Sequence, residues 1–361
     1  MSKPTDLTGT ARAPVSAAAP ERATPLELFF DLVYVFAFTQ VTHLMADGEN
    51  FTSVLAGLAV LGVLWWSWAS YAWLANQQIA DRGAVRVGLL GAIAIVLVLS
   101  IAIPEAYPEE NGSLFAALLF SIGFMVLSVV YTVVTLGLAG ADWALRRQVL
   151  RTMGVTILPV AAALIVGAVL GGTAQLVLWL TAVAIEGATV YLTSRGGQWR
   201  LPSAAHYAER HGLVVILALG ESIISIGLAA SHSPLTPVVV GASLLAVCLS
   251  LGLWRVYFGE VSPTAERQIN ALSGQRRAAV ATVGTYLHLG IVAGILLASL
   301  GMGGAIERIG SGEPIALFSW AALAGGVVLF LASTASYARA VRPRLTPVSR
   351  RPSRGATVSR T

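Results

Sequence analysis

The sequence predicts an all-α, polytopic integral membrane protein with about ten transmembrane helices and both termini in the cytoplasm. Hydrophobic residues make up 56% of the 361 residues and charged residues only 11%, whereas soluble domains carry roughly 25% charged residues. The apolar residues form long runs close to the ~20 residues with which an α-helix crosses a bilayer. Strands of a membrane barrel would instead be about 10 residues long and would alternate strictly.

Ten apolar runs, separated by short polar stretches, define the expected spans. The flanking residues 1–23 and 342–361 are rich in Ala, Pro, Ser, Thr and Arg, a composition too polar to bury a core. We therefore expect disordered cytoplasmic arms at both ends and one membrane helix bundle over residues 24–341. The expected spans lie at 26–45, 51–75, 84–103, 114–138, 149–170, 173–193, 212–230, 235–258, 279–300 and 315–340.

The distribution of basic residues predicts how these spans are oriented. With the N-terminus inside, 22 of the 23 Lys and Arg residues lie in inner loops, at inner helix ends or in the tails, and Arg308 alone lies outside. This is the positive-inside bias of membrane proteins. We therefore attribute the net charge of +5 to membrane orientation and not to nucleic-acid binding. The basic C-terminal tail is expected to contact anionic lipid.

The first span carries two acidic residues at its inner end. Thr24, Pro25 and Glu27 form a capping-box pattern at the start of a helix, which explains Glu27 without a further role. Asp31 lies one turn deeper on the same face, where a carboxylate must point into the bundle. Asp31 is therefore either half of an ion pair that locks two helices or part of a site for a cation or a proton. His43 lies near the outer end of the same span.

A second group of polar residues belongs to the seventh span. Glu209, Arg210 and His211 precede this span, and Glu221 lies about nine residues inside it. An isolated carboxylate near the middle of the membrane is rare and costly. Glu221 is therefore either a neutral, hydrogen-bonded packing residue or a functional carboxylate. Arg210 is a candidate cation partner for Asp31.

Three further ionisable residues lie within the later spans. Glu186 lies in the inner half of the sixth span, His288 near the middle of the ninth, and Arg255 at the inner end of the eighth. Arg255 either extends to the inner surface or neutralises Glu27 or Asp31, and His288 is either a packing residue or part of a pathway. Acidic residues outnumber basic ones in the inner half, which favours a cation or a proton over an anion as the ligand.

Aromatic residues are concentrated at the inner end of the second span. Two interpretations remain for this group: an aromatic belt at the membrane interface, or a cage that binds a cation. The group consists of Trp65, Trp66, Trp68, Tyr71 and Trp73.

Motifs typical of soluble and metal-dependent enzymes are absent. The sequence has no GxxxxGK[ST] loop, no Rossmann GxGxxG motif followed by an acid, no GxSxG elbow and no HExxH pair. Cys248 is the only cysteine, and His206 and His211, five residues apart on a helix, do not converge on one metal. We therefore expect no metal site and no cofactor, and we assign no catalytic residue.

Two long segments of the sequence resemble a known family. Residues 27–43 (ELFFDLVYVFAFTQVTH) and 206–222 (HYAERHGLVVILALGES) are similar to the two signature stretches of the bacterial low temperature requirement protein A (LtrA) family, as are 73–76 (WLAN) and 286–294 (YLHLGIVAG). The resemblance covers about 24–342. It implies a multi-pass protein of the bacterial plasma membrane, linked by name to growth in the cold, and implies no particular reaction. The residues that it marks are Glu27, Asp31, His43, Glu209, His211 and Glu221.

Three functions are compatible with these features. Ionisable groups inside spans usually mark ion or substrate pathways, which favours a secondary transporter or an ion or proton pathway that uses Asp31 and Glu221. The first alternative is a non-catalytic, lipid-responsive or structural membrane protein whose acids only lock helices. The second alternative is a membrane-embedded, lipid-modifying enzyme with Glu209 and His211 as acid and base.

Overall fold

The computed structural model describes residues 22–77, 80, 82–107, 112–194 and 201–342. Within these residues the chain forms helices and no strand, and ten of the helical segments are long and apolar enough to cross a membrane. The predicted all-α, ten-span fold is confirmed. The predicted terminal arms, 1–23 and 342–361, lie almost entirely outside the described residues.

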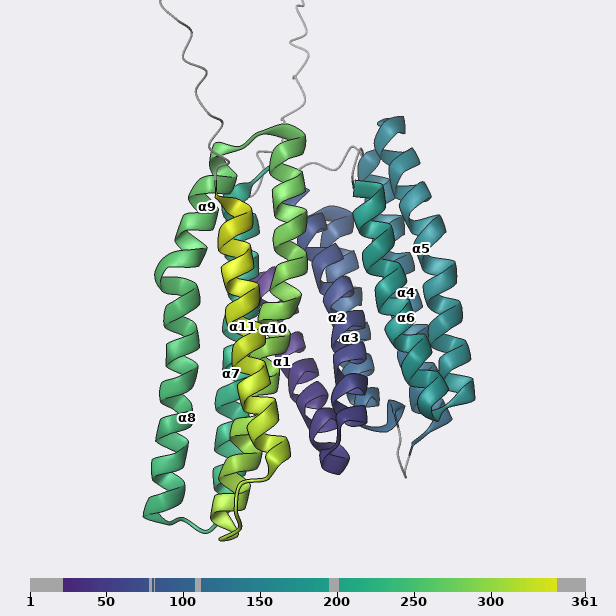
Figure 1. Ribbon diagram of the computed structural model, residues 1–361. Helices are drawn as coiled ribbons and strands as arrows, with labels where there is room; N and C mark the ends of the chain where they lie inside the picture. Colours follow the sequence, from purple (N-terminus) through teal and green to yellow (C-terminus); the bar gives the residue numbers. More distant parts are fainter. Residues whose placement is uncertain (1–21, 78–79, 81, 108–111, 195–200, 343–361) are drawn as a thin grey trace, which may run out of the picture.

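The helices follow one another through short connections (Figure 1). Their bounds are α1 Pro25–Ala46, η1 Asp47–Glu49, α2 Phe51–Gln77, α3 Gly83–Ala106, α4 Leu114–Ala139, α5 Trp143–Leu170, α6 Gly172–Ser194, α7 Ala204–Ser231, α8 Pro237–Val256, η2 Tyr257–Val261, α9 Ser262–Ala271, α10 Gly274–Gly310 and α11 Leu317–Val341.

Helices α1 and α2 lie between two groups of helices, α7–α11 on one side and α3–α6 on the other (Figure 1). The most hydrophobic window of α2 is 72% buried by protein, whereas that of the segment containing α8 is 22% buried. The aromatic side chains of α2 therefore lie inside the protein, and Trp65, Trp68 and Tyr71 are each 1% exposed. Trp65, Trp66, Trp68 and Tyr71 therefore do not form an interfacial belt, because protein buries them, whereas Trp73 is half-buried.

Helices α10 and α11 pack closely enough for their backbones to touch. A Cβ atom on Gly294 or Gly301 of α10 would collide with backbone atoms of α11, and one on Gly326 of α11 would collide with backbone atoms of α10. Small residues allow this close approach between transmembrane helices. The 37-residue α10 also packs against α7.

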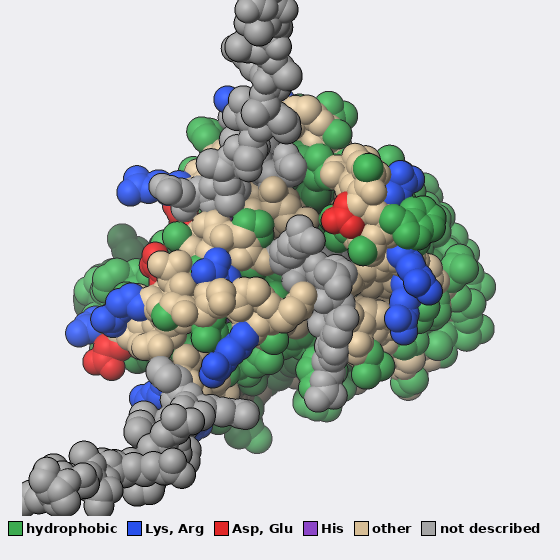
Figure 2. All heavy atoms as spheres, turned by 90° about the horizontal axis from the view of Figure 1, so that it is seen from above, with side chains coloured by type: hydrophobic (Ala, Val, Ile, Leu, Met, Phe, Trp, Pro, Cys, Tyr) green, Lys and Arg blue, Asp and Glu red, His purple; other side chains and the backbone are tan. Residues whose placement is uncertain are grey.

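The described chain ends leave the bundle on the same face, as an even number of spans requires (Figure 1). Arginine side chains gather around this face (Figure 2), whereas Arg308 lies at the opposite end of α10. We call the arginine-rich face the inner face, in accordance with the predicted orientation, and the opposite face the outer face.

Helix α7 starts earlier in the sequence than predicted. It begins at Ala204, eight residues before the predicted start at 212, so the segment containing Arg210 and His211 belongs to the helix and is buried. The polar residues of this segment lower the local hydropathy, although His206, Arg210 and His211 are buried by protein. The eighth segment also extends beyond its predicted end, through the π-helical turn η2 and α9 to Ala271.

Candidate functional site

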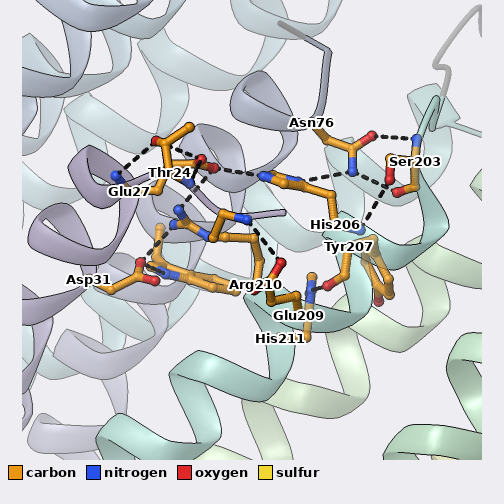
Figure 3. Close-up of polar contacts among 12 residues, drawn as sticks. Thr24, Glu27, Asp31, Asn76, Ser203, His206, Tyr207, Glu209, Arg210 and His211 are labelled. Carbon is orange, nitrogen blue, oxygen red and sulfur yellow. Dashed lines mark hydrogen bonds and ion pairs between the residues drawn. The ribbon is translucent and has the colours of Figure 1, made fainter. Parts of the chain in front are cut away.

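Four ionisable side chains meet between α1 and α7 near the inner face. These residues, Glu27, Asp31, His206 and Arg210, are each 0–1% exposed, and we call them the inner cluster. Arg210 Nη2 lies 2.7 Å from Asp31 Oδ1, and Arg210 Nη1 lies 3.1 Å from Glu27 Oε1 (Figure 3). Each helix supplies two residues spaced four apart, which places both on one face.

Glu27 belongs both to the start of α1 and to the inner cluster. Its Oε2 accepts hydrogen bonds from the backbone N–H of Thr24 at 2.7 Å and from the Thr24 hydroxyl at 2.9 Å. The Thr24 hydroxyl in turn accepts a hydrogen bond from the Glu27 backbone N–H, which completes the predicted capping box. Its other oxygen, Oε1, lies 2.8 Å from His206 Nε2. The capping role thus holds the carboxylate at the position where it meets α7.

The orientation of His206 is fixed by an asparagine from α2. Asn76 Oδ1 accepts a hydrogen bond from the Ser203 backbone N–H at 3.2 Å, and Asn76 Nδ2 donates to the Ser203 carbonyl at 2.7 Å. This pairing sets the direction of the amide, so Nδ2 also points its N–H at His206 Nδ1, 3.2 Å away (Figure 3). His206 Nδ1 therefore accepts and Nε2 donates to Glu27, which is the pattern of a neutral imidazole.

Two carboxylates thus share one guanidinium in the inner cluster. Asp31 Oδ1 accepts from Arg210 and also from Trp68 Nε1 at 2.9 Å, and Asp31 Oδ2 has no hydrogen-bond partner among the described residues. The guanidinium carbon of Arg210 lies 5.9 Å from the Trp68 ring and 6.0 Å from the Phe30 ring. Arg210 Nε and Nη1 also have no hydrogen-bond partner among the described residues, so the cluster has unused donors as well as an unused acceptor, with two aromatic rings beside its cation.

Glu221 occupies a different environment on the same helix pair. It is 1% exposed, and its carboxyl faces the hydroxyls of Thr42 on α1 and Ser299 on α10. Its Oε2 has no hydrogen-bond partner, and none of the ion pairs of the described residues includes it. At 1.5 Å per residue, the eleven residues from Arg210 to Glu221 place it about 16 Å further towards the outer face.

A cavity of about 540 Å³ opens between the outer ends of α1, α7, α10 and α11. Thr42, which faces Glu221, forms part of its wall together with His43, Ser225 and Ser319. We call this space the outer cavity. At its rim, Glu49 binds Arg308 at 2.8 Å, and Arg308 also binds Glu313 at 2.8 Å. The outer cavity therefore reaches to within one side chain of the buried carboxylate.

A third polar group lies between α7 and α10. His211 Nε2 lies 3.1 Å from the Thr285 hydroxyl, and His288 Nε2 lies 2.7 Å from the hydroxyl of Tyr257. The Nδ1 atoms of the two histidines lie 2.9 Å and 2.7 Å from backbone carbonyls, which only accept, so each Nδ1 carries the proton. In each ring Nε2 therefore faces a hydroxyl as an acceptor, and the two ring centroids are 4.7 Å apart.

The remaining predicted site residues are separated in the structure. Glu209 is exposed on α7 and accepts a hydrogen bond from the Ala23 backbone N–H at 2.9 Å, whereas its neighbour His211 is buried, so the two do not face each other. Arg255 is exposed at the end of α8 and lies outside the inner cluster. Glu186 is buried on α6, in the other group of helices.

Three residues of the inner cluster and its surroundings were not among the predicted site residues. These are His206, which bonds Glu27, Asn76, which orients His206, and Trp68, which bonds Asp31. One signal was present in the sequence: His206 and Arg210 repeat on α7 the four-residue spacing of Glu27 and Asp31 on α1. Two acids and two nitrogen bases at matched spacing indicate facing helices.

The fold and its buried charges define a polytopic α-helical membrane protein with ionisable groups in its interior. The model of the family described as bacterial low temperature requirement A protein (LtrA) matches residues 22–353, and the chain belongs to this family. A protein of Rhizobium meliloti (strain 1021), described as uncharacterized protein RA0937, is 31% identical over 346 residues, covering 90% of this chain and 78% of its own. No solved structure matches the chain.

Proposed function

We propose that the protein is a secondary transporter or an ion or proton pathway in which Glu221 carries the proton or a small cation. One observation carries this proposal: Glu221 is fully buried, has no cation partner among the described residues, and lies one side chain below the outer cavity. Ionisable groups in such positions usually mark pathways, because holding an unpaired carboxylate in a membrane interior is costly.

In this proposal the inner cluster closes the route towards the inner face. Between its level and that of Glu221, α1 and α7 contribute side chains such as Tyr34, Phe38, Val214 and Ala218, all 0–1% exposed, which separate the two levels. A cation that reaches Asp31 would compete with Arg210 for the carboxylate, because Asp31 Oδ2 remains available as an acceptor. The exchange of partners at Asp31 would then open the inner side.

Flux measurements with the purified protein test the proposal. Proteoliposomes that contain a dye selective for the ion under test are placed under a proton, Na⁺ or K⁺ gradient, and the wild type is expected to dissipate at least one of these gradients. Glu221→Gln should fold and insert normally but lose this flux, because the amide cannot gain and lose a charge. Glu105→Gln, which changes an exposed carboxylate on α3, is the matched control and should retain it.

The structural alternative makes the opposite prediction for the same experiment. Its support is the inner cluster, in which one guanidinium joins two carboxylates and ties α7 to α1. If the buried charges serve only to hold α7 against α1, either the wild type dissipates no gradient or Glu221→Gln conducts as the wild type does. Either result would exclude Glu221 as a carrier and favour a non-catalytic, lipid-responsive or structural role.

We further propose that the protein resides in the bacterial plasma membrane and that its basic C-terminal tail contacts anionic lipid. The support is the family membership together with six arginines at and after 342. Clusters of basic residues next to a transmembrane helix are attracted to anionic lipid headgroups. A peptide of residues 343–361 should co-sediment with phosphatidylglycerol vesicles in low salt and should be released by high salt or by replacing the lipid with a zwitterionic one.

A further inference from the structure

A groove of about 430 Å³ lies at the inner end of α7, against η2 and α9. Helices α7 and α9 lie side by side near the inner face (Figure 1). Arg22, which precedes α1, completes the lining. We call this space the α7–α9 groove. None of its lining residues belongs to the inner cluster or lines the outer cavity.

The wall that α7 contributes changes from acidic to apolar along the helix. Glu209, Leu213 and Ile216 all line the groove, and their spacing of four and three residues places them on one face of α7. At 1.5 Å per residue, Leu213 and Ile216 lie about 6 Å and about 10 Å deeper in the membrane than Glu209. Ile216 is 46% exposed, so in a bilayer the deeper end of this wall faces hydrocarbon.

The opposite wall shows the same change from a chain that runs the other way. Glu266, Ser262 and Phe258 line the groove from α9 and η2 at intervals of four residues. The eighth segment runs towards the inner face, so Phe258 lies deeper than Glu266. The Phe258 ring packs against Gly212 of α7, where a Cβ would lie 3.4 Å from Phe258 Cε1. Both walls thus carry a carboxylate at the inner end and an apolar side chain at the deeper end.

The three charged side chains of the groove are not paired with one another. None of the ion pairs of the described residues includes Arg22, Glu209 or Glu266. Glu209 accepts a hydrogen bond from the Ala23 backbone N–H through Oε2, and its Oε1 is available for a ligand. A single space with two carboxylates, one guanidinium and an apolar end is complementary to a molecule with a cationic group, an anionic group and a hydrocarbon chain.

We propose that the α7–α9 groove binds one phospholipid of the inner leaflet with a primary ammonium headgroup, of the phosphatidylethanolamine type. The ammonium donates to the two carboxylates at the inner end, and the phosphate accepts from Arg22. Hydrogen bonds between ionised groups of this kind are stronger than those between neutral groups. The acyl chain lies along the apolar side chains at the deeper end. The inference does not depend on transport through Glu221.

The charges and the size of the groove select this class of lipid. The headgroup of phosphatidylglycerol carries a negative charge and no cation, so the two carboxylates would repel it. The quaternary ammonium of phosphatidylcholine has no N–H with which to donate. The groove of about 430 Å³ is much larger than the roughly 150 Å³ cavity that accommodates benzene in an engineered protein core, so an ethanolamine phosphate headgroup fits.

Native mass spectrometry of the purified full chain, delipidated in a mild detergent and titrated with single lipids, tests the site. The wild type should bind one phosphatidylethanolamine with a Kd at least about tenfold lower than that for phosphatidylglycerol of the same acyl chains, because only the former gains the charged hydrogen bonds. The double variant Glu209→Gln/Glu266→Gln should lose this preference. Both positions are exposed, so the fold should be retained. Glu260→Gln, which changes an exposed carboxylate of η2 outside the groove, is the matched control and should keep the preference.

Two further arms separate the headgroup from the acyl chain. Phe258→Ala, which shortens the apolar wall, should weaken the binding of both lipids by a similar factor and leave the preference unchanged. Soluble phosphoethanolamine should not compete at equal concentration, because it lacks the chain.

The outcome is independent of the transport proposal, because Glu221→Gln should bind phosphatidylethanolamine as the wild type does. Four results would each overturn the lipid site: no saturable binding of phosphatidylethanolamine, equal binding of the two lipids by the wild type, an unchanged preference in the double variant, or full competition by soluble phosphoethanolamine.

Discussion

The inner cluster and the surroundings of Glu221 are two levels of one contact between α1 and α7, about three helical turns apart. At the inner level α1 supplies the acid Asp31 and α7 supplies the base Arg210, which bind each other at 2.7 Å. Eleven residues further along both helices, α1 supplies the hydroxyl of Thr42 and α7 supplies the acid Glu221. One level pairs its carboxylates with a cation, and the other leaves its carboxylate facing uncharged groups.

The difference shows how burial acts on charge in this protein. Removing one partner of a buried ion pair strongly destabilises the fold, because the other partner stays charged without water or a counter-charge. A buried carboxyl that faces only hydroxyls has no charged partner. Its charge can therefore change without leaving another buried charge unpaired. The inner level is therefore suited to hold helices together, and the Glu221 level is suited to gain and lose a proton or cation.

The largest expected effect comes from removing the shared cation. Arg210→Gln should lower the apparent free energy of unfolding by about 3–5 kcal/mol, because Glu27 and Asp31 are then left without it in the interior. Denaturation of the purified protein in mixed detergent micelles measures this. The matched control Arg255→Gln changes an exposed arginine and should stay within about 0.5 kcal/mol of the wild type. Similar stability of both variants would show that the inner cluster does not hold the helices.

The next effect separates the two carboxylates of the inner cluster. Asp31→Asn alone should be less damaging than Arg210→Gln, because Arg210 keeps Glu27 as a partner 3.1 Å away. Combining the two changes removes one acid and one base together, and part of the Arg210→Gln defect should be recovered. A double-mutant cycle should give a coupling energy of about 0.5–3 kcal/mol. Strictly additive effects would mean that the pair makes no net contribution.

Much of the fold could be predicted from the sequence, because the membrane imposes simple rules. Span length and the side on which arginines lie follow from bilayer thickness and orientation, and the ten predicted spans match ten helices. The start of α7 could not be predicted in this way. Hydropathy averages all faces of a helix, so buried charges such as Arg210 lower the score even when they face other charges.

The polar residues of the site were partly predictable for a related reason. A lone carboxylate in an apolar run, such as Asp31 or Glu221, is conspicuous because it has no place in lipid. The partner of such a carboxylate is not conspicuous in the sequence, because the choice between Arg210 and Arg255 depends on which helices are in contact. The roles of Asn76 and Trp68 were also hidden, since both depend on contacts between helices far apart in the sequence.

A smaller effect is expected from the amide that orients His206. Asn76→Ala removes the hydrogen bonds to His206 and to the backbone of Ser203, which leaves buried polar groups unsatisfied and should cost about 1–3 kcal/mol. Unfolding in mixed micelles again gives the value, and Asn270→Ala, at an exposed position on α9, is the control. If Asn76→Ala matched this control, the ring of His206 would not depend on its amide partner.

The smallest expected effect on stability is also the sharpest test of the comparison. Glu27→Gln and Glu221→Gln make the same chemical change on facing helices, at sites equally buried. At Glu27 the change removes a charge that Arg210 and His206 both contact, and hydrogen bonds to charged groups contribute about 1.5–3 kcal/mol.

At Glu221 no cation loses a partner, and the glutamine amide can donate to the hydroxyls that the carboxyl faces. Glu221→Gln should therefore lower the free energy of unfolding less than Glu27→Gln does, because it breaks no buried ion pair. If the two substitutions had equal effects on unfolding, a cation or another charged partner would have to act on Glu221 as well, and the two levels would not differ as the geometry indicates.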